Sequence, residues 1–466
     1  MSRESRMIKT TIIYFVGNFA SKLLAFFLLP LYTAYLTPED FGAVDMVTST
    51  LPLIAPIFTM QVTESIFRFL CSYNDNWKRK KIITNSTIIF IIGLFIFIIS
   101  FIPFSMIYKF NFSKLFIIYF ISVYLGIFFQ QILRGFHMNL DYSIIGVVST
   151  LVQASLNILL ITKVNMGGEA LLIAAIGSSI VISIISALRI KIWKFIDFKL
   201  IEKDIIIKQL KYGIPLIPNQ ICWWIIGLLG KYILVYFQGS ADNGILAVAS
   251  KFPGLLTTIS SIFFLAWTEN IIQEYNSKDR DEYFSKAFTL FFIFSLCAAA
   301  CLLPVIKIYN ILTIGSEYRD AWVYIPILFI GALFNGFASF LGTIYTASMQ
   351  TKDAFITTVI GAVSNLIFSI ILTPILGILG VVIANMISFI ILFYARIKSV
   401  NKIVNISINY RNSTIPIVLL NLSLIIYYKF DMGFQIVFLV MFILGSIYMN
   451  KGIILDFLNR IKREKS

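Results

Sequence analysis

Long apolar stretches alternate with short polar connectors along the whole chain. A membrane-spanning helix needs about 20 predominantly apolar residues, and about fourteen stretches meet that requirement, so the pattern predicts an all-α polytopic membrane protein. Successive connectors are then expected on opposite sides of the membrane. The predicted spans are Ile12–Leu36, Phe41–Leu70, Ile82–Phe104, Leu115–Leu133, Ser143–Thr162, Ala170–Leu188, Gly213–Gln238, Gly244–Ile272, Phe284–Tyr309, Ala321–Thr346, Ala354–Thr373, Leu376–Arg396, Ser413–Tyr428 and Gly433–Lys451.

The first twelve spans form two similar blocks of six. Gly42 and Gly244 lie at corresponding positions in the two blocks, and segment 63–66 is similar in sequence to segment 268–271. Because each block has an even number of spans, both enter the membrane in the same orientation, with a pseudo-symmetry axis along the membrane normal and a cavity between them. The predicted parts are an N-terminal six-helix bundle (1–190), a basic cytoplasmic connector (191–212), a C-terminal six-helix bundle (213–398), and two extra transmembrane helices with a basic tail (399–466).

The chain is basic, with 38 Lys and Arg against 23 Asp and Glu and a formal net charge of +15. Most of these cations fall in the connectors on the side of the amino terminus, including the run Lys78–Lys81 and the central connector. This is the positive-inside asymmetry, which predicts that both termini are cytoplasmic. The charge therefore reflects membrane topology, and we expect no nucleic-acid partner.

Residues for enzymatic or metal chemistry are few. The chain has one histidine, His137, and four cysteines without metal-ligand spacing. No phosphate-binding loop of the G-x-x-x-x-G-K-[ST] type occurs, so this chain is not expected to use ATP. We predict no catalytic residues, no metal and no cofactor, and a protein that is not an enzyme.

Charged side chains inside the predicted spans are the candidate functional residues, because a lysine at the membrane centre costs about 2.5 to 3.5 kcal/mol. Lys22, Lys231 and Lys251 lie in the first, seventh and eighth spans, and Asp45 lies in the second. One interpretation is that the lysines pair with Asp45 or Glu269, or extend to the interface. The other is that the surplus of cations binds an anion. The polar stripes next to the lysines add Asn18, Gln220 and Trp224 as candidate substrate-binding residues.

Three further charges lie near the cytoplasmic ends of spans. Glu64 and Arg68 are four residues apart on one predicted helix, which favours an ion pair, and Glu269 is the counterpart of Glu64 in the second block. We assign these three residues a structural or gating role. Asp45 is the candidate for ion coupling, because it is the acid in the outer and central zone of the spans.

Three segments carry a resemblance to a known family. They are 31–42 (LYTAYLTPEDFG), 133–135 (LRG) and 377–384 (GILGVVIA), and the similarity extends over essentially the whole length. The chain resembles the multidrug/oligosaccharidyl-lipid/polysaccharide exporter superfamily, in its polysaccharide transporter (Wzx-like flippase) branch.

The resemblance implies a flippase in the bacterial plasma membrane. Its substrate would be an undecaprenyl-pyrophosphate-linked oligosaccharide, translocated by alternating access for surface polysaccharide such as O-antigen or capsule. Family members carry cationic residues in the central cavity, which Lys22, Lys231 and Lys251 match in type. The implied partners are the lipid-linked oligosaccharide, membrane lipids and other polysaccharide-assembly proteins.

Three alternative functions stay open. A drug or cation antiporter of the same superfamily would need acidic groups for its substrate, whereas lysines outnumber acids here. A lipid II flippase shares the superfamily fold, but its arginine-rich first span is not found in this chain. A membrane polymerase would need a catalytic loop, and the predicted external turns are too short for one.

Overall fold

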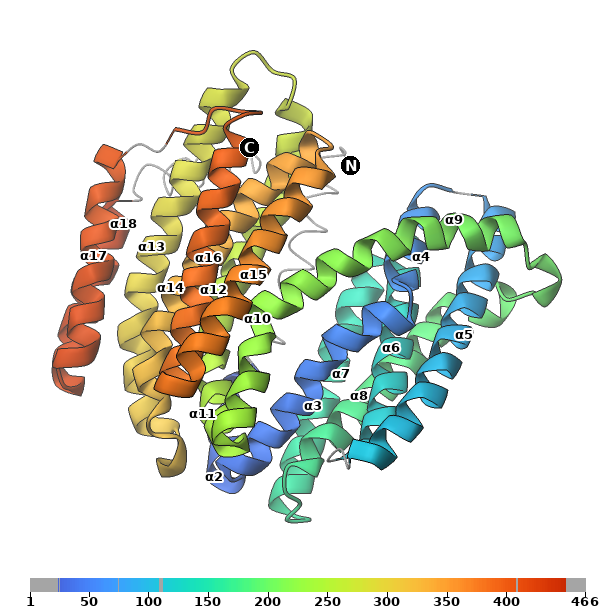
Figure 1. The fold of residues 1–466 in the computed structure, drawn as a ribbon, viewed down its shortest axis with the longest axis horizontal. Coiled ribbons are helices and arrows are strands. Elements are labelled where there is room, and N and C mark those ends of the chain that lie inside the picture. Colours follow the sequence, from blue (N-terminus) through green and yellow to red (C-terminus); the bar gives the residue numbers. More distant parts are fainter. Residues whose placement is uncertain (1–23, 25, 74, 109–111, 408–409, 450–466) are drawn as a thin grey trace, which may run out of the picture. The chain divides into compact units, whose positions relative to one another are not determined.

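The computed structural model describes residues 24, 26–73, 75–108, 112–407 and 410–449. Within these ranges the chain is helical, without strands, which confirms the predicted all-α class (Figure 1). Two compact units are formed: residues 1–247 with 365–377, and residues 248–364 with 378–466. The division of the chain into two six-helix bundles at the basic connector stays a prediction.

Unit 1 contains the helices from the beginning of the described chain to the start of α11. They are α2 (Leu29–Tyr35), α3 (Pro38–Phe58), α4 (Val62–Cys71), α5 (Asn76–Tyr108), α6 (Ser113–Gly135), α7 (Asn139–Thr162), α8 (Glu169–Ile190), α9 (Lys203–Gly213) and α10 (Ile217–Gln238). Helix α8 packs against α6 and α7. Stacked rings fill the centre, with the centroids of Phe97 and Phe120 only 3.9 Å apart.

The predicted second span is wrong in one respect, because it consists of two helices. Helix α3 begins at Pro38, where the Thr37 side chain accepts a hydrogen bond from the Asp40 N–H, and it ends two residues after Pro56. Met60 and Gln61 then adopt left-handed backbone conformations, with φ of 50° and 54°, before α4 begins. Proline removes a backbone donor from the helix interior, so the helix breaks here where the apolar pattern continues.

The basic connector is fixed to α5 by polar contacts. The Asn85 amide donates to the Leu200 carbonyl oxygen at 3.0 Å and accepts from the Glu202 N–H at 2.9 Å. Gln209 of α9 donates to the Ser86 hydroxyl at 2.7 Å. Asparagine and glutamine satisfy connector backbone groups that have no regular secondary-structure partner, so the connector has a defined path over unit 1.

Unit 2 contains most of α11 (Ser240–Lys251) and the helices that follow. They are α12 (Pro253–Glu274), α13 (Arg280–Thr313), α14 (Ala321–Ala347), α15 (Thr351–Leu376), α16 (Ile378–Val400), α17 (Tyr410–Lys429) and α18 (Met432–Met449), with α15 shared between the units. Helix α14 packs along α16, and the two extra helices pack on α13. The predicted eighth span is also broken, because Pro253 begins a new helix directly after Lys251 and Phe252.

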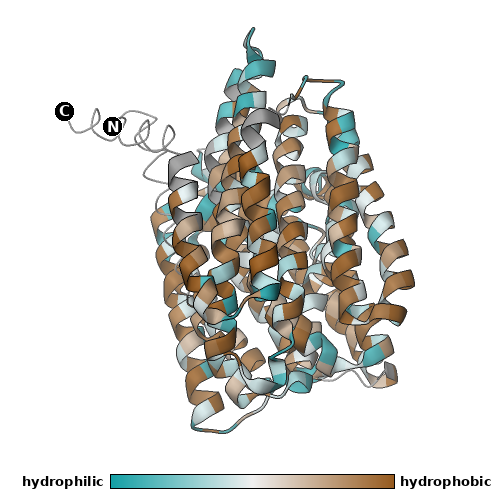
Figure 2. Cartoon of the chain, turned by 90° about the vertical axis from the view of Figure 1, so that its left-hand side faces the viewer, coloured by the Kyte–Doolittle hydropathy of each residue, from teal (hydrophilic) through white to brown (hydrophobic). Residues whose placement is uncertain are grey.

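Ten helices in the described ranges are long and apolar enough to cross a membrane, and α17 and α18 contain shorter apolar segments. Figure 2 shows hydrophobic residues along the middle of the helices that face the viewer, with hydrophilic residues collected towards the helix ends. Length and composition therefore identify a multi-pass membrane protein. The start of the predicted first span lies outside the described residues.

Candidate functional site

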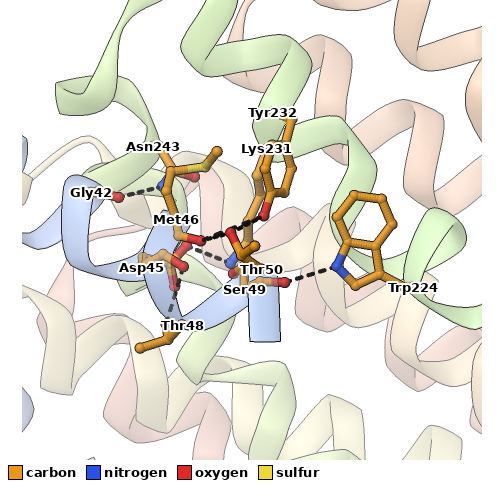
Figure 3. A network of polar contacts seen from close by, with 10 residues as sticks. All are labelled: Gly42, Asp45, Met46, Thr48, Ser49, Thr50, Trp224, Lys231, Tyr232 and Asn243. Atoms are coloured by element: carbon orange, nitrogen blue, oxygen red, sulfur yellow. Dashed lines mark hydrogen bonds and ion pairs between the residues drawn. The ribbon is translucent and has the colours of Figure 1, made fainter. Parts of the chain in front are cut away.

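A buried ion pair joins α3 and α10 inside unit 1. The Lys231 ammonium donates to Asp45 Oδ2 at 2.7 Å, and each side chain is only 10% exposed. Asp45 follows the N-terminal turns of α3, and Lys231 lies in the second half of α10, two turns before its end. Figure 3 shows the two side chains pointing toward each other from their separate helices. The structure thus supports, for Lys231, the interpretation in which a lysine pairs with Asp45.

Asn243 of α11 completes the surroundings of the carboxylate. Its side-chain amide donates to Asp45 Oδ2 at 3.3 Å and to the Gly42 carbonyl oxygen at 2.9 Å. Asn243 is fully buried, and its Oδ1 has no hydrogen-bond partner among the described residues. Two donors from different helices therefore contact the Asp45 carboxylate, and an acceptor oxygen is left beside the pair.

Two more polar contacts connect α3 to α10 on the same side as the ion pair (Figure 3). The hydroxyls of Thr50 and Tyr232 are 2.6 Å apart, and the Trp224 indole N–H donates to the Ser49 carbonyl oxygen at 2.8 Å. The Trp224 and Tyr232 rings contact each other, with centroids 5.1 Å apart. The α3–α10 contact therefore includes an ion pair and hydrogen bonds, which water can replace when helices separate.

Two glycines allow α3 and α11 to approach at their first turns. A Cβ atom at Gly42 would overlap the Ser240 carbonyl oxygen, and one at Gly244 would overlap the Pro38 carbonyl oxygen. Pro38 precedes Gly42 by the same four residues by which Ser240 precedes Gly244, so the contact is reciprocal. This is the relation expected of two pseudo-symmetric segments meeting at an axis. At the same offset, Asp45 corresponds to the buried Ala247, which carries no charge.

Burial makes this ion pair interdependent. Two charges removed from water lose hydration, and in a buried pair their attraction and hydrogen bonds offset that loss. Removing one partner leaves an uncompensated charge at a cost of about 3 to 5 kcal/mol. Each charge is therefore stable in this buried site only while its partner is beside it.

The remaining candidate residues have different surroundings. Trp224 is 8% exposed and takes part in the α3–α10 contact, whereas Gln220 on the same helix is exposed. Lys251, at the end of α11, is exposed and belongs to unit 2. Lys22 and Asn18 lie outside the described residues, as does the side chain of Glu269. A shared space for the three lysines stays a prediction.

Glu64 and Arg68 do not pair with each other as expected. Glu64 accepts a hydrogen bond from Gln131 Nε2 at 3.2 Å, and the Gln131 oxygen accepts one from Arg134 at 2.9 Å. The Arg68 guanidinium donates to the Ser72 hydroxyl at 3.2 Å. Helix α6 supplies the partner of Glu64, because α4 packs directly against α6, whereas the partner of Arg68 lies at the end of α4.

Sequence reasoning missed Asn243, Thr50 and Tyr232. Asn243 lies in a segment rich in turn-forming residues, and its fully buried side chain is not what such a segment predicts. Tyr232 follows Lys231 directly in α10, and its hydroxyl lies 2.6 Å from that of Thr50. Tyrosine carries a polar hydroxyl that requires a partner when buried, and that signal was available from the sequence.

The geometry described so far defines a polytopic membrane protein whose fold is shared with solved transporters. The structure is similar to one described as "Lipid II flippase MurJ, inward closed conformation", with 17% identity, a TM-score of 0.73, and coverage of 95% of this chain and 100% of that chain. It is also similar to an inward-facing multidrug resistance MATE family transporter of the MOP superfamily, with 16% identity, a TM-score of 0.63, and coverage of 84% and 95%. At these identities the likeness concerns the fold.

The sequence itself matches a family. Residues 7–272, more than half of the chain, match the family described as "Polysaccharide biosynthesis protein". No curated protein sequence matches the chain closely. The chain belongs to the polysaccharide biosynthesis protein family and has the fold of MOP superfamily transporters, which confirms the predicted resemblance.

Proposed function

We propose that the chain is a flippase that translocates undecaprenyl-pyrophosphate-linked oligosaccharides across the bacterial plasma membrane for surface polysaccharide biosynthesis. The observation that carries this proposal is the match of residues 7–272 to the polysaccharide biosynthesis family. The similarity of the fold to transporters supports translocation in preference to bond formation. The distribution of positive charge supports cytoplasmic positions for both termini.

The Asp45–Lys231 pair is suited to be a contact that opens and closes during transport. Alternating access requires contacts between the two repeats to break and form again. Helix α3 lies in the first predicted bundle and α10 opens the second, and their contact is built from an ion pair and hydrogen bonds. Such contacts exchange for water at little net cost, whereas an apolar contact of the same area would resist opening.

Opening would change the role of Lys231. Once separated from Asp45, its ammonium would be available to the anionic pyrophosphate of the substrate. Trp224, freed from Ser49, could then stack on a sugar ring, and Gln220 on the same helix could bind hydroxyls. Lys22, Asn18 and Lys251 are proposed as further members of this binding surface. In this scheme Lys231 pairs with Asp45 at one stage of the transport cycle and binds the substrate at another.

Asp45 is proposed as the group that couples transport to an ion gradient. Binding of a proton or a cation at its carboxylate would remove the attraction that holds Lys231. The unpartnered Oδ1 of Asn243 lies on the side chain that already contacts Asp45, and it supplies an acceptor for such an ion. Release of Lys231 would then depend on the ion occupancy of Asp45.

The α3–α10 contact gives no support to a cationic drug as the substrate. It contains one acid and one lysine, so its opening exposes no surplus of negative charge. A multidrug antiporter would need that surplus to attract a cation. A lipid II flippase has the same charge requirement as our proposal, and the identity of the sugar must be determined by assay.

The experiment is reconstitution of the purified chain in proteoliposomes with three substrates: an undecaprenyl-pyrophosphate-linked oligosaccharide, lipid II, and a cationic drug. Translocation of the oligosaccharide, with loss in Asp45→Asn and Lys231→Gln, supports the proposal. The matched control is Lys286→Gln, because Lys286 is an exposed, ion-paired lysine in α13. Translocation of lipid II alone or drug alone would overturn the substrate assignment, and formation of new glycosidic bonds would identify a polymerase.

A further inference from the structure

A second buried lysine, Lys307, has no acid to pair with in the described part of unit 2. It lies in α13 and is 8% exposed, and its ammonium forms neither a hydrogen bond nor an ion pair with the described residues. The ammonium instead lies 3.3 Å from the centre of the Trp322 ring and 5.1 Å from that of Tyr427. Asp431, in the turn after α17, attracts it only at longer range.

An unpartnered amide lies one helical turn away. Asn310 is three residues after Lys307, so the two side chains share a face of α13. Asn310 is 3% exposed, and its Nδ2 has no hydrogen-bond partner among the described residues. The cluster therefore offers N–H donors from an ammonium and an amide without matching acceptors. A group rich in acceptor oxygens is the complement of such a set.

The aromatic rings leave the hydrogen-bonding capacity of this lysine unused. Cation–π contacts contribute about 0.5 to 2 kcal/mol, but the rings accept no ordinary hydrogen bond from the ammonium. Their positions are fixed by other contacts, since the Tyr427 hydroxyl donates to the Trp322 carbonyl oxygen at 2.9 Å. The rings are therefore held in place, and the N–H donors of Lys307 and Asn310 are left for an acceptor.

The cluster lies close to one end of its helices. Helix α13 has 34 residues, about 50 Å at 1.5 Å per residue, against a hydrocarbon thickness of about 30 Å. Lys307 is close to its last turn, Trp322 is in the first turn of α14, and Tyr427 is in the last turn of α17. Tryptophan and tyrosine are enriched at the membrane interface, which is the depth of phospholipid headgroups.

We propose that Lys307 and Asn310, between the rings of Trp322 and Tyr427, form a binding site for the phosphate of an anionic phospholipid. Helix α13 begins at Arg280 on the predicted cytoplasmic side. The site lies at the other end of this helix, on the predicted outer side of the membrane. A bound phosphate would accept hydrogen bonds from the Lys307 ammonium and the Asn310 amide. It would thereby stabilise the packing of α17 on α13 and α14. The site does not depend on which substrate the chain transports.

The test is a lipid titration of the purified full chain followed by native mass spectrometry. Phosphatidylglycerol is compared with diacylglycerol, which has the same tails and no phosphate. We expect wild type and Lys307→Arg to retain phosphatidylglycerol about tenfold more strongly than Lys307→Met does, the effect of a hydrogen bond to a charged group. Lys286→Met is the control, because this exposed lysine lies on the same helix and is paired with Glu282.

Unchanged phosphatidylglycerol binding in a folded Lys307→Met would overturn the site and leave a lysine held by aromatic rings alone. Equal binding of the two lipids by wild type would overturn it as well. If Lys307→Met does not fold, Asn310→Leu decides, because it removes the amide donors at similar volume. Weaker binding in that variant supports the site, and unchanged binding refutes it.

Discussion

Two buried lysines are accommodated in different ways. Lys231 and Lys307 are both 8% exposed within membrane-spanning helices. Lys231 has a carboxylate at 2.7 Å, contributed by a helix far away in the sequence, whereas Lys307 has aromatic rings from α14 and α17. A carboxylate pair is strong, but it can be separated by hydration or protonation. The Trp322 and Tyr427 side chains carry no charge near neutral pH, so the second arrangement suits a permanent contact and the first suits a reversible one.

The largest expected difference concerns removal of each ammonium. Lys231→Met leaves Asp45 buried and unpaired, and should lower the free energy of unfolding by about 3 to 5 kcal/mol. Lys307→Met leaves no charge behind and should lower it by at most about 2 kcal/mol. Thermal unfolding in detergent measures both. The double variant Asp45→Asn/Lys231→Met should recover most of the loss; a double variant as unstable as Lys231→Met would show that the pair is not the cause.

The next largest effect on stability is expected at the reciprocal contact of Gly42 and Gly244. Gly42→Ala places a Cβ against the Ser240 carbonyl oxygen, and Gly244→Ala places one against the Pro38 carbonyl oxygen. Each should destabilise the paired form by about 1 to 3 kcal/mol, as overpacking does. Solvent accessibility of a cysteine introduced at the buried Ser49, which leaves the Asp45–Lys231 pair intact, would report the opening. Gly227→Ala is the control, since no atom lies within 4 Å of a Cβ at that position on α10.

Two tryptophan hydrogen bonds provide a smaller and more specific contrast. Trp224→Phe removes the bond to the Ser49 carbonyl oxygen, and Trp267→Phe removes the bond to the Thr343 hydroxyl in unit 2. Each should cost about 0.5 to 1.5 kcal/mol of stability. Transport rate should change in Trp224→Phe alone, because Trp267 lies outside the α3–α10 contact. Equal effects of both substitutions on the transport rate would show that the α3–α10 contact has no special role in transport.

The smallest effect on stability is expected at Asp197 in the basic connector. The hydrogen bond from Lys80 lowers the pKa of Asp197 below its usual range. A depressed pKa means that the carboxylate stabilises the fold above about pH 4 and that this contribution disappears as the pH falls through the folded-state pKa. Asp197→Asn should therefore lower the unfolding temperature slightly at pH 7 and not at pH 3. A difference of equal size at both pH values would contradict this assignment.

The fold was largely predictable from the sequence, because twenty-residue apolar stretches have few structural alternatives in a membrane. The breaks after Phe58 and at Phe252 were not predicted, since hydropathy continues through both while the backbone does not. Lys231 and Asp45 were recognised as candidates from the cost of burying charge. Their pairing was one of two interpretations, because helix register and rotation, which place Lys231 opposite Asp45, are set by packing that the apolar pattern does not encode.

Asn243 illustrates what remained outside prediction. A turn-like sequence indicates an exposed end of a helix, yet the close approach at Gly42 and Gly244 buries this asparagine completely. The two glycines were noticed as corresponding positions of a repeat, and their function as the point of contact required three dimensions. The sequence was therefore enough to identify Asp45 and Lys231 as candidates. Asn243 could be identified as their neighbour only from the structure.

The central claim is that Asp45 and Lys231 act as an exchangeable pair during transport. The most direct test is to swap the charges and measure translocation of lipid-linked oligosaccharide in proteoliposomes. Asp45→Lys and Lys231→Asp place like charges together, so each alone should abolish transport, and the double variant should restore a substantial part of it. Transport by either single variant at the wild-type rate, or a folded double variant with no transport, would contradict the account.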